Sequence, residues 1–525
     1  MPRRVVQEFR GAYKLTSKLA IPPDGLGEAE NVGFFRGGDG RVKVQGRNGR
    51  SLLATVSADD TIVGLHRHYE AGGTIPKSTI VAYDDGSNAL FKHATNDSTT
   101  YAAPSGAPTL TKDTSFNFAN FPGTDITYIT NGVDAPYSYD VNAGTVMAAW
   151  TPTNLTPRGR AITVWANRVW CAHSDNILYA TNNGNPGVIT TTEALAFDSA
   201  RGGEILNVFG YGDVLITITD TGCFRFTGQI SASTIDSSDF LEYSTVGGVG
   251  ERSACLTDYG VAYGARDGIY LTNGFGANVN IAAPIMELWP AAGYPDMVVR
   301  WDPAEQQLRV RLQATDDYCW VATRVDLRLG TSPSSRPILR AGSSISPTQF
   351  YVKAVTNKNI VWAWAKHLNT PMADGTAYPG AVDSGQFISG DTAGKLWLQN
   401  DGLLDDETDV IPLIETAPIP VSDRYQENGL VDVVRITYKG RHSCIATINM
   451  DNRGVRHPTI PVPIGETSDD DDRIVDGWIR MWDMSNKGVR TDVEIRLPRR
   501  GKEAELHSIL IDTLAVIGDS AERSA

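Results

Sequence analysis

A tight turn followed by a short strand recurs along this chain at a nearly constant interval. The clearest copy runs from Gly260 to Gly274, where a turn at Asp267-Gly268 separates two apolar strands. Glycine suits such a turn because it tolerates the positive φ that tight hairpins need. The last turn residues before the strands are Gly40, Gly86, Gly132, Asn176, Gly222 and Gly268. Successive positions lie 46, 46, 44, 46 and 46 residues apart.

Two weaker copies of the turn follow, at Asp316-Asp317 and at Ala393-Gly394. A period of roughly 40–50 residues with strands in every unit is typical of a β-propeller. One small sheet cannot bury its faces alone, so several sheets must pack around an axis. Turns that recur by chance in another β-protein would not hold so regular an interval. The repeat therefore predicts an all-β fold with a propeller of six to eight blades, rather than a sandwich or a mixed β array.

The composition agrees with a folded, strand-rich chain of two or three domains. The chain has 525 residues, of which 41% are hydrophobic and 21% charged, so it is not a disordered protein. It also holds 51 Gly, 19 Tyr and 11 Trp, a mixture that fits many short strands joined by tight turns.

Changes in strand pattern predict three regions. Residues 1–30 are expected to be an extended N-terminal segment, and residues 31–400 the propeller. Within the propeller, residues 348–400 would close the ring, with the N-terminal segment completing the last blade. Residues 283–290 predict a short helix with proline at its start and end. Residues 401–525 carry longer alternating strands and no long helix, which predicts a separate β-sandwich-like domain.

Charge and cysteine usage limit the partners and the compartment. The net charge of −14 argues against tight binding of nucleic acid, because phosphate neutralisation supplies most of that affinity. The average says little about local patches. We expect reduced, buried thiols from a chain folded in cytoplasm, because the five cysteines are widely spaced. They are Cys171, Cys223, Cys255, Cys319 and Cys444. We find neither a secretory signal nor a membrane-spanning run.

Sequence patterns of the common enzyme classes are missing, and we expect no catalytic residue, cofactor site or metal site. There is no Gly-x-Ser-x-Gly elbow, no phosphate-binding Gly-x-x-x-x-Gly-Lys loop and no His-Glu-x-x-His. His66 and His68 would share a strand face, but a third metal ligand is not evident nearby. The run Asp469 to Asp472 lacks the spacing of a calcium loop, so a solvated loop is the expected structure.

Two acidic pairs and one basic cluster are further candidates for function. The pairs Asp59-Asp60 and Asp84-Asp85 fall in turn-like contexts. Adjacent strand residues point to opposite faces, so such pairs are poorly placed for two-carboxylate catalysis. A basic cluster near the C-terminus is either a contact patch for a partner or a solvated face. It consists of Arg496, Arg499, Arg500 and Lys502.

Four phrases in the first 400 residues resemble the tail nozzle proteins of short-tailed bacteriophages, which are structural or head-completion proteins with a propeller body. The phrases are Tyr128–Tyr137 (YITNGVDAPY), Asn167–Trp170 (NRVW), Ile218–Gly222 (ITDTG) and Asp267–Tyr270 (DGIY). The start of the chain and the order of propeller and C-terminal β-domain are also similar to those proteins. The likeness is one of strands and turns, and it is weaker after residue 401.

This resemblance implies a non-enzymatic virion component of the phage tail. Nozzle proteins form a ring, usually of six copies, below the portal and adaptor rings, and they hold packaged double-stranded DNA until ejection. The resemblance implies no cofactor and no catalytic residues. An acidic channel would fit this role, since negative charge repels the DNA backbone and lets it slide. Assembly in the host cytoplasm would agree with the lack of a secretory signal.

Two other functions stay open. A tail-associated receptor- or glycan-binding propeller would present an exposed aromatic cluster, for which Trp362 and Trp364 are the local candidates. Packing is the more frequent fate of tryptophan, however. A propeller glycosidase would need acidic residues that converge on the central axis, a placement that a sequence does not reveal.

Overall fold

The computed structural model describes most of the chain between residues 3 and 515. The segments outside the described residues are 7–8, 16–19, 23, 37–40, 69–77, 96–97, 123, 142–145, 153–158, 174–175, 198–202, 228–239, 277, 291–292, 329–357, 378–386, 400, 402–403, 406–407, 421–428, 440–443, 453–454, 459–461, 465–473, 481–486, 489 and 498–504, together with 1–2 and 516–525.

The chain forms two compact units, each built from separate stretches of sequence. The propeller unit contains residues 49–321 and 368–407. The terminal unit contains residues 1–48, 322–367 and 408–525.

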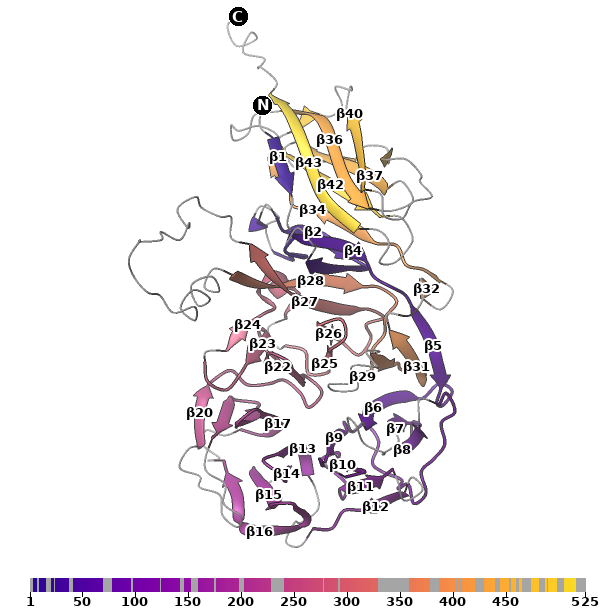
Figure 1. The fold of residues 1–525 in the computed structure, drawn as a ribbon, viewed down its shortest axis with the longest axis vertical. Coiled ribbons are helices and arrows are strands. Elements are labelled where there is room, and N and C mark those ends of the chain that lie inside the picture. Colours follow the sequence, from indigo (N-terminus) through magenta and orange to yellow (C-terminus); the bar gives the residue numbers. More distant parts are fainter. Residues whose placement is uncertain are drawn as a thin grey trace, which may run out of the picture. The chain divides into compact units, whose positions relative to one another are not determined.

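The propeller unit is a ring of small antiparallel sheets, as the sequence repeat predicts (Figure 1). Six blades are sheets of their own, and a further ring position is held by β25 (Val298–Asp302) and β26 (Gln307–Arg311) with the start of β27 (Cys319–Arg328). Their strands, in ring order, are β6 (Thr61–His68), β7 (Ser78–Asp84) and β8 (Ala89–Thr95); β9 (Asn117–Asn120), β10 (Ile126–Thr130), β11 (Tyr137–Asp140) and β12 (Val146–Ala149); β13 (Gly159–Trp165), β14 (Arg168–His173), β15 (Ile177–Asn182) and β16 (Asn185–Ala196); β17 (Ile205–Tyr211), β18 (Val214–Thr219), β19 (Cys223–Phe226) and β20 (Phe240–Ser244); β21 (Ala254–Thr257), β22 (Gly260–Ala265), β23 (Gly268–Thr272) and β24 (Val279–Asn280); β25 (Val298–Asp302), β26 (Gln307–Arg311) and β27 (Cys319–Arg328); and β29 (Asp374–Thr376), β30 (Ile388–Gly390), β31 (Lys395–Gln399), β5 (Arg50–Thr55) and β32 (Leu404–Asp405). The first strand of each group contacts the first strand of the next, from β6 around to β29 and back to β6.

The repeated turns of the sequence mark one equivalent place in every blade. Each described turn joins the second strand of a blade to the third. Asp85-Gly86, for example, lies between β7 and β8, and Ala393-Gly394 lies between β30 and β31. Gly86, Gly132, Asn176 and Gly394 have the positive φ that such a turn needs. Gly40 lies outside the described residues.

The core of the propeller unit consists of apolar layers between neighbouring blades. Trp170 of one blade and Phe226 of the next lie in the same buried cluster, with ring centroids 6.0 Å apart. A second cluster joins Phe91 to Tyr139, which belong to another pair of adjacent blades. Apolar residues on both faces of each small sheet thus become buried only when the ring assembles.

Strand β5 closes the ring. It lies at the start of the propeller unit and pairs antiparallel with β31, near the end of the unit, with Leu52 opposite Trp397. The last blade is therefore completed by residues 50–55 and not by the N-terminal segment 1–30, which was expected to complete it and belongs to the terminal unit. The predicted short helix is present as a 3₁₀ helix, η3 (Ala283–Leu288), with proline at its start.

The terminal unit is also made of strands, and they combine both ends of the chain. One sheet has the order β3-β4-β43-β36-β40, with β1 and β41 also paired to it; another series runs β28-β2-β34-β42-β37-β38. These strands and their short neighbours are β1 (Arg3–Val6), β2 (Leu26–Glu30), β3 (Val32–Arg36), β4 (Val42–Gly46), β28 (Lys358–His367), β33 (Thr408–Asp409), β34 (Leu413–Thr416), β35 (Ile419–Pro420), β36 (Gly429–Lys439), β37 (Cys444–Asn452), β38 (Val455–Pro458), β39 (Val462–Ile464), β40 (Ile474–Arg480), β41 (Lys487–Gly488), β42 (Arg490–Arg496) and β43 (Glu505–Ala515). Val434, Ile436 and Tyr438 of β36 are fully buried while Arg435 between them is exposed, so the predicted alternation is confirmed. Sandwich packing of this unit stays a prediction.

The division differs from the continuous regions 1–30, 31–400 and 401–525. Residues 31–48 were expected to begin the propeller, but β4 pairs with the C-terminal strand β43, with Val44 opposite Leu506. Strand β28 was expected to help close the ring, but it belongs to the terminal unit. The N-terminal segment is also more than extended chain, since β1 pairs with β43. Local pattern identified these strands but not their partners, which lie hundreds of residues away.

Gly394 provides a test of the repeated turn. Its φ is +72°, and a Cβ there would lie only 1.7 Å from the Ser57 carbonyl oxygen. At the equivalent Gly86, with φ of +83°, a Cβ would meet nothing within 4 Å. We expect Gly86→Ala to cost about 1–2 kcal/mol from backbone strain alone. Gly394→Ala should cost clearly more, about 3 kcal/mol or above, because strain and a backbone clash add. Urea unfolding of both variants measures the difference, and equal costs would contradict this description of the turn.

Candidate functional site

The inner strands and their connecting turns line two cavities of the propeller unit that are open to solvent. We call the first the aspartate cavity; it has a volume of about 550 Å³ and is lined by six aspartates. They are Asp59, Asp60, Asp84, Asp85, Asp113 and Asp296. We call the second the aromatic cavity; it measures about 370 Å³, and Phe116, Phe118, Phe209 and Trp301 contribute to its lining. Both volumes fall in the range of roughly 300–1,000 Å³ that is usual for small-molecule sites.

Turn chemistry places several of these aspartates. Asp84 accepts a hydrogen bond from the backbone N–H of Gly86 at 2.8 Å and another from Asp113 N–H at 2.8 Å. Asp85 accepts from the backbone N–H groups of Ser87 and Asn88, at 2.8 and 2.7 Å. These side chains therefore cap the blade turns, as aspartate commonly does. The turn-like contexts predicted for Asp59-Asp60 and Asp84-Asp85 are confirmed.

The aspartate cavity is acidic overall. Two arginines, Arg252 and Arg311, line it together with the six aspartates, which gives a formal charge of −4. The backbone N–H groups of Asn88 and Ser87 lower the pKa of Asp85, so this carboxyl stays ionised. An ionised carboxylate repels other anions and accepts hydrogen bonds. It is a poor general acid, because it holds no proton to donate.

An ion pair fixes one wall of the aromatic cavity. Arg300 on β25 donates from Nε and Nη2 to Asp374 Oδ1, at 2.7 and 2.6 Å. The other oxygen, Asp374 Oδ2, accepts from the backbone N–H of Leu65 at 2.8 Å. Asp374 thus joins the inner strands β25, β29 and β6.

A second ion pair of the propeller unit joins Arg160 to Glu251, at 3.0 Å. Burial raises the pKa of Glu251, and the positive charge of Arg160 opposes this shift.

The two predicted strand-face histidines, His66 and His68, make ordinary side-chain contacts. The His66 ring stacks on Phe118 with centroids 5.0 Å apart, and its Nε2–H donates to Asn120 Oδ1 at 2.8 Å. His68 Nδ1 lies 2.9 Å from Thr127 Oγ1. Among the described residues, no group of three or more His, Cys, Asp or Glu is arranged to hold a metal ion.

His66 provides a pH-dependent test. Burial lowers its pKa to about 4, while the unfolded chain has an ordinary value near 6.5. Because the folded-state pKa is depressed, the unfolded state gains the proton first, and stability falls as the pH drops from 6.5 toward 4. We expect His66 to account for a loss on the order of 2 kcal/mol between pH 7.5 and pH 5. Urea unfolding at both pH values should show a smaller loss in His66→Gln. An unchanged loss would contradict the assignment, although His93, whose pKa is also lowered by burial, leaves some pH dependence in the variant.

The two candidates for an exposed aromatic cluster, Trp362 and Trp364, are packed in the interior. Trp362 and Trp364 are only 8% and 0% exposed, and they lie on β28 of the terminal unit. They cannot present an aromatic surface to a sugar on the propeller. The run Asp469 to Asp472 lies outside the described residues, as do Arg499, Arg500 and Lys502. Arg496 is described and pairs with Glu494 at 3.2 Å on the surface of its unit.

All five cysteines are buried, as predicted, and none forms a disulfide. Burial raises the pKa of Cys171, Cys255 and Cys444 to about 12, which keeps these thiols protonated and unreactive. No helix in the described part of the chain has the length and apolar character needed to cross a membrane.

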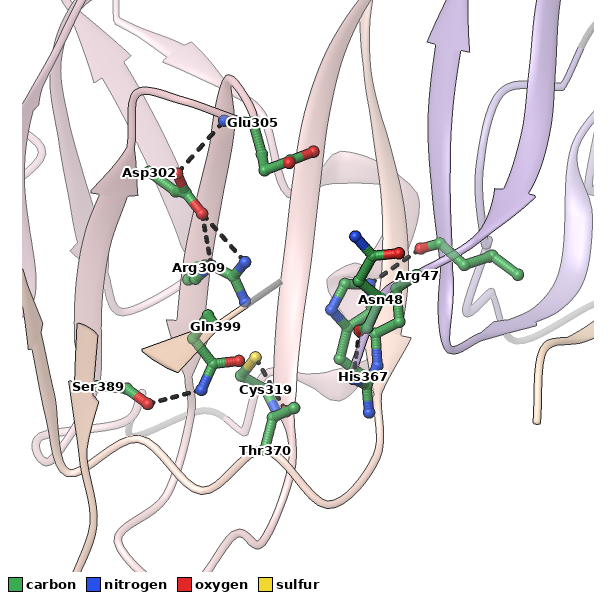
Figure 2. A network of polar contacts seen from close by, with 11 residues as sticks. Arg47, Asn48, Asp302, Glu305, Arg309, Cys319, His367, Thr370, Ser389 and Gln399 are labelled. Carbon is green, nitrogen blue, oxygen red and sulfur yellow. Dashed lines mark hydrogen bonds and ion pairs between the residues drawn. The ribbon is translucent and has the colours of Figure 1, made fainter. Parts of the chain in front are cut away.

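A set of polar side chains buried in the blades was not predicted from sequence. Arg309 on β26 donates from Nε and Nη2 to Asp302 Oδ2, at 3.2 and 3.0 Å, with both side chains almost fully buried (Figure 2). Gln399 likewise donates to Ser389 Oγ at 2.7 Å (Figure 2). The alternation of Arg309 and Arg311 with apolar neighbours is the available sequence signal, and it does not distinguish a buried strand face from a solvated one.

Neither the family models nor the curated proteins compared with the chain give a match. Among solved structures, a chain of a mitotic checkpoint complex is similar at 11% identity and a TM-score of 0.37, over 61% of this chain and 83% of that one. YCF48 bound to a D1 peptide is similar at 10% identity and 0.37, over 66% and 95%. The computationally designed Ika8 protein is similar at 9% identity and 0.34, over 66% and 99%.

Proposed function

We propose that this chain is a structural protein of a short-tailed bacteriophage tail, of the nozzle type. About six copies would form a ring below the portal and adaptor rings, and packaged double-stranded DNA would leave through that ring. The protein acts in the virion without enzymatic activity or a cofactor, after assembly in the host cytoplasm.

The position of the nozzle-like phrases carries this proposal. All four lie at hairpins of the propeller unit, where one strand turns into the next within a blade. Residues 128–137 join β10 to β11, and residues 167–170 lie at the start of β14. Residues 218–222 join β18 to β19, and residues 267–270 begin β23. The resemblance therefore falls on structurally repeated positions, which supports a shared blade design.

The charge distribution also supports passage of DNA rather than capture of DNA. The chain carries a net charge of −14, of which a formal −4 is concentrated at the aspartate cavity of the propeller unit. Negative surfaces repel phosphates, so a duplex in their vicinity would slide without sticking.

A sugar-directed role is the second candidate, and the aspartate cavity is the observation that favours it. Glycosidases use two carboxyl groups, and this cavity gathers several acidic side chains from different blades. Asp85, held ionised by backbone hydrogen bonds, does not suit the general acid of such a pair. Robust hydrolysis of any member of a broad glycan panel would exclude a purely structural role.

Rotational symmetry tests the proposal. The purified full chain is imaged by negative stain, alone and after addition of the tail component that precedes it. Class averages with a closed ring of about six copies are expected. Particles that remain single in both conditions would contradict the nozzle role and would favour a monomeric binding protein.

A further inference from the structure

Two arginines on one face of β26 differ sharply in their partners. Arg309 and Arg311 are two residues apart, so they point to the same side of the strand. Arg309 is 2% exposed and is neutralised by the carboxylate of Asp302. Arg311 is 3% exposed and lines the aspartate cavity.

Arg311 makes no hydrogen bond or ion pair among the described residues, and the charges of Asp374, Asp316 and Asp296 act on it only from a greater distance. Its Nε is buried without a hydrogen bond, and none of the described carboxylates forms an ion pair with it. Leaving a buried guanidinium unpaired is costly, because a desolvated charge needs a counter-ion or several hydrogen bonds. By contrast, Arg309 on the same strand face forms an ion pair with Asp302.

A second cation stands beside the first. Arg252 also lines the cavity, and its described hydrogen bond is a long one, 3.4 Å to the Ala373 carbonyl oxygen. Burial, followed by the nearby charge of Arg252, lowers the pKa of Arg311 to about 10. Two arginines that repel each other at the wall of a cavity form a receptor for a planar anion, since guanidinium groups match carboxylate geometry.

The remaining wall offers acceptors for hydroxyl groups. Asp59 and Asp296 line the same cavity, and neither side chain makes a hydrogen bond or an ion pair among the described residues. Ser115 adds a hydroxyl to this lining. Ionised carboxylates only accept hydrogen bonds, so a ligand that fits here must bring donors of its own.

We propose that the aspartate cavity binds an acidic sugar, whose carboxylate lies on Arg311 and Arg252 and whose hydroxyls donate to Asp59 and Asp296. The volume of about 550 Å³ is suitable for a small organic ligand. The formal charge of −4 limits the ligand to few negative charges and disfavours phosphates and polyanions. This inference does not depend on the nozzle role.

Calorimetric titration of the full chain with D-glucuronate, acetate and D-glucose tests the proposal. Glucuronate is expected to bind at least about tenfold more tightly than acetate or glucose, because only glucuronate has both the carboxylate and the hydroxyls. Arg311→Gln should weaken glucuronate binding by at least about tenfold. Arg225→Gln is the matched control, because Arg225 also has an unpaired Nε but lies on β19 outside the cavity lining. It should bind glucuronate as the parent chain does.

Several results would overturn the proposal. They are absent glucuronate binding, equal binding of glucose, tighter binding of inorganic phosphate or of an acidic peptide, and unchanged binding in Arg311→Gln. If Arg311→Gln does not fold, Arg252→Gln takes its place, since Arg252 is less buried. The melting temperature of the parent chain should also rise with glucuronate and not with glucose.

Discussion

Replacement of Arg309 by methionine is expected to destabilise the propeller unit by about 3–5 kcal/mol. The side chains of Arg309 and Asp302 are 2% and 0% exposed, so the variant leaves a carboxylate in the core without its cation. The Asp302 carboxylate also accepts a hydrogen bond from the backbone N–H of Glu305 at Oδ1, at 3.3 Å, but a backbone donor does not replace the charge of the arginine. Urea unfolding at pH 7, followed by tryptophan fluorescence, measures the loss.

Arg311→Met is the matched control for this substitution. It removes the same side chain from the same face of β26, but no described carboxylate pairs with Arg311. We expect its stability without ligand to be unchanged or higher, because a buried unpaired charge is removed. Equal losses in the two variants would show that the arginines act through packing alone, and would contradict the distinction between them.

Trp397→Ala should also cause a large loss, about 3–5 kcal/mol, by weakening the closure of the ring. Trp397 on β31 is 3% exposed, and its Nε1–H donates to Asp391 Oδ2 at 2.7 Å. The Arg50 guanidinium of β5 lies 3.8 Å from the centroid of the same ring. The substitution therefore removes buried area, a hydrogen bond and a contact to the closing strand together.

Leu52→Ala on β5 is the control for ring closure. Leu52 lies opposite Trp397 in the strand pairing, but it is 44% exposed, so its truncation should change stability by no more than about 0.5–1 kcal/mol. Limited proteolysis should cut near residues 50–60 faster in Trp397→Ala than in Leu52→Ala. A Trp397 variant that is as stable and as resistant as the Leu52 variant would argue against closure through β5 and β31.

The blade repeat could be predicted from sequence because the turn that marks it is a local property. Asp85-Gly86 and Asp267-Gly268 consist of residues that favour positive φ or cap a turn. The structure confirms a turn at both positions. The division into units could not be predicted in the same way. Val44 pairs with Leu506 across more than 400 residues, and nothing in the residues around either position specifies such a partner.

The candidate site shows the same limit. Asp59 and Asp84 were correctly placed in turns, but their convergence on one cavity depends on how the blades close into a ring. Arg311 looked like an ordinary polar position on an alternating strand. Its burial follows from the neighbouring blades, and its lack of a partner becomes visible only beside Arg309. Residue type and spacing therefore indicated the elements, and tertiary packing determined which of them meet.

The mass of the purified protein in solution is the most direct test of the proposed ring. Light scattering over a range of concentrations, alone and with the preceding tail component, measures the number of copies. The nozzle role predicts a species of six times 56.8 kDa, about 340 kDa, in at least one of these conditions. A mass of 56.8 kDa in all of them would contradict a ring-forming virion protein.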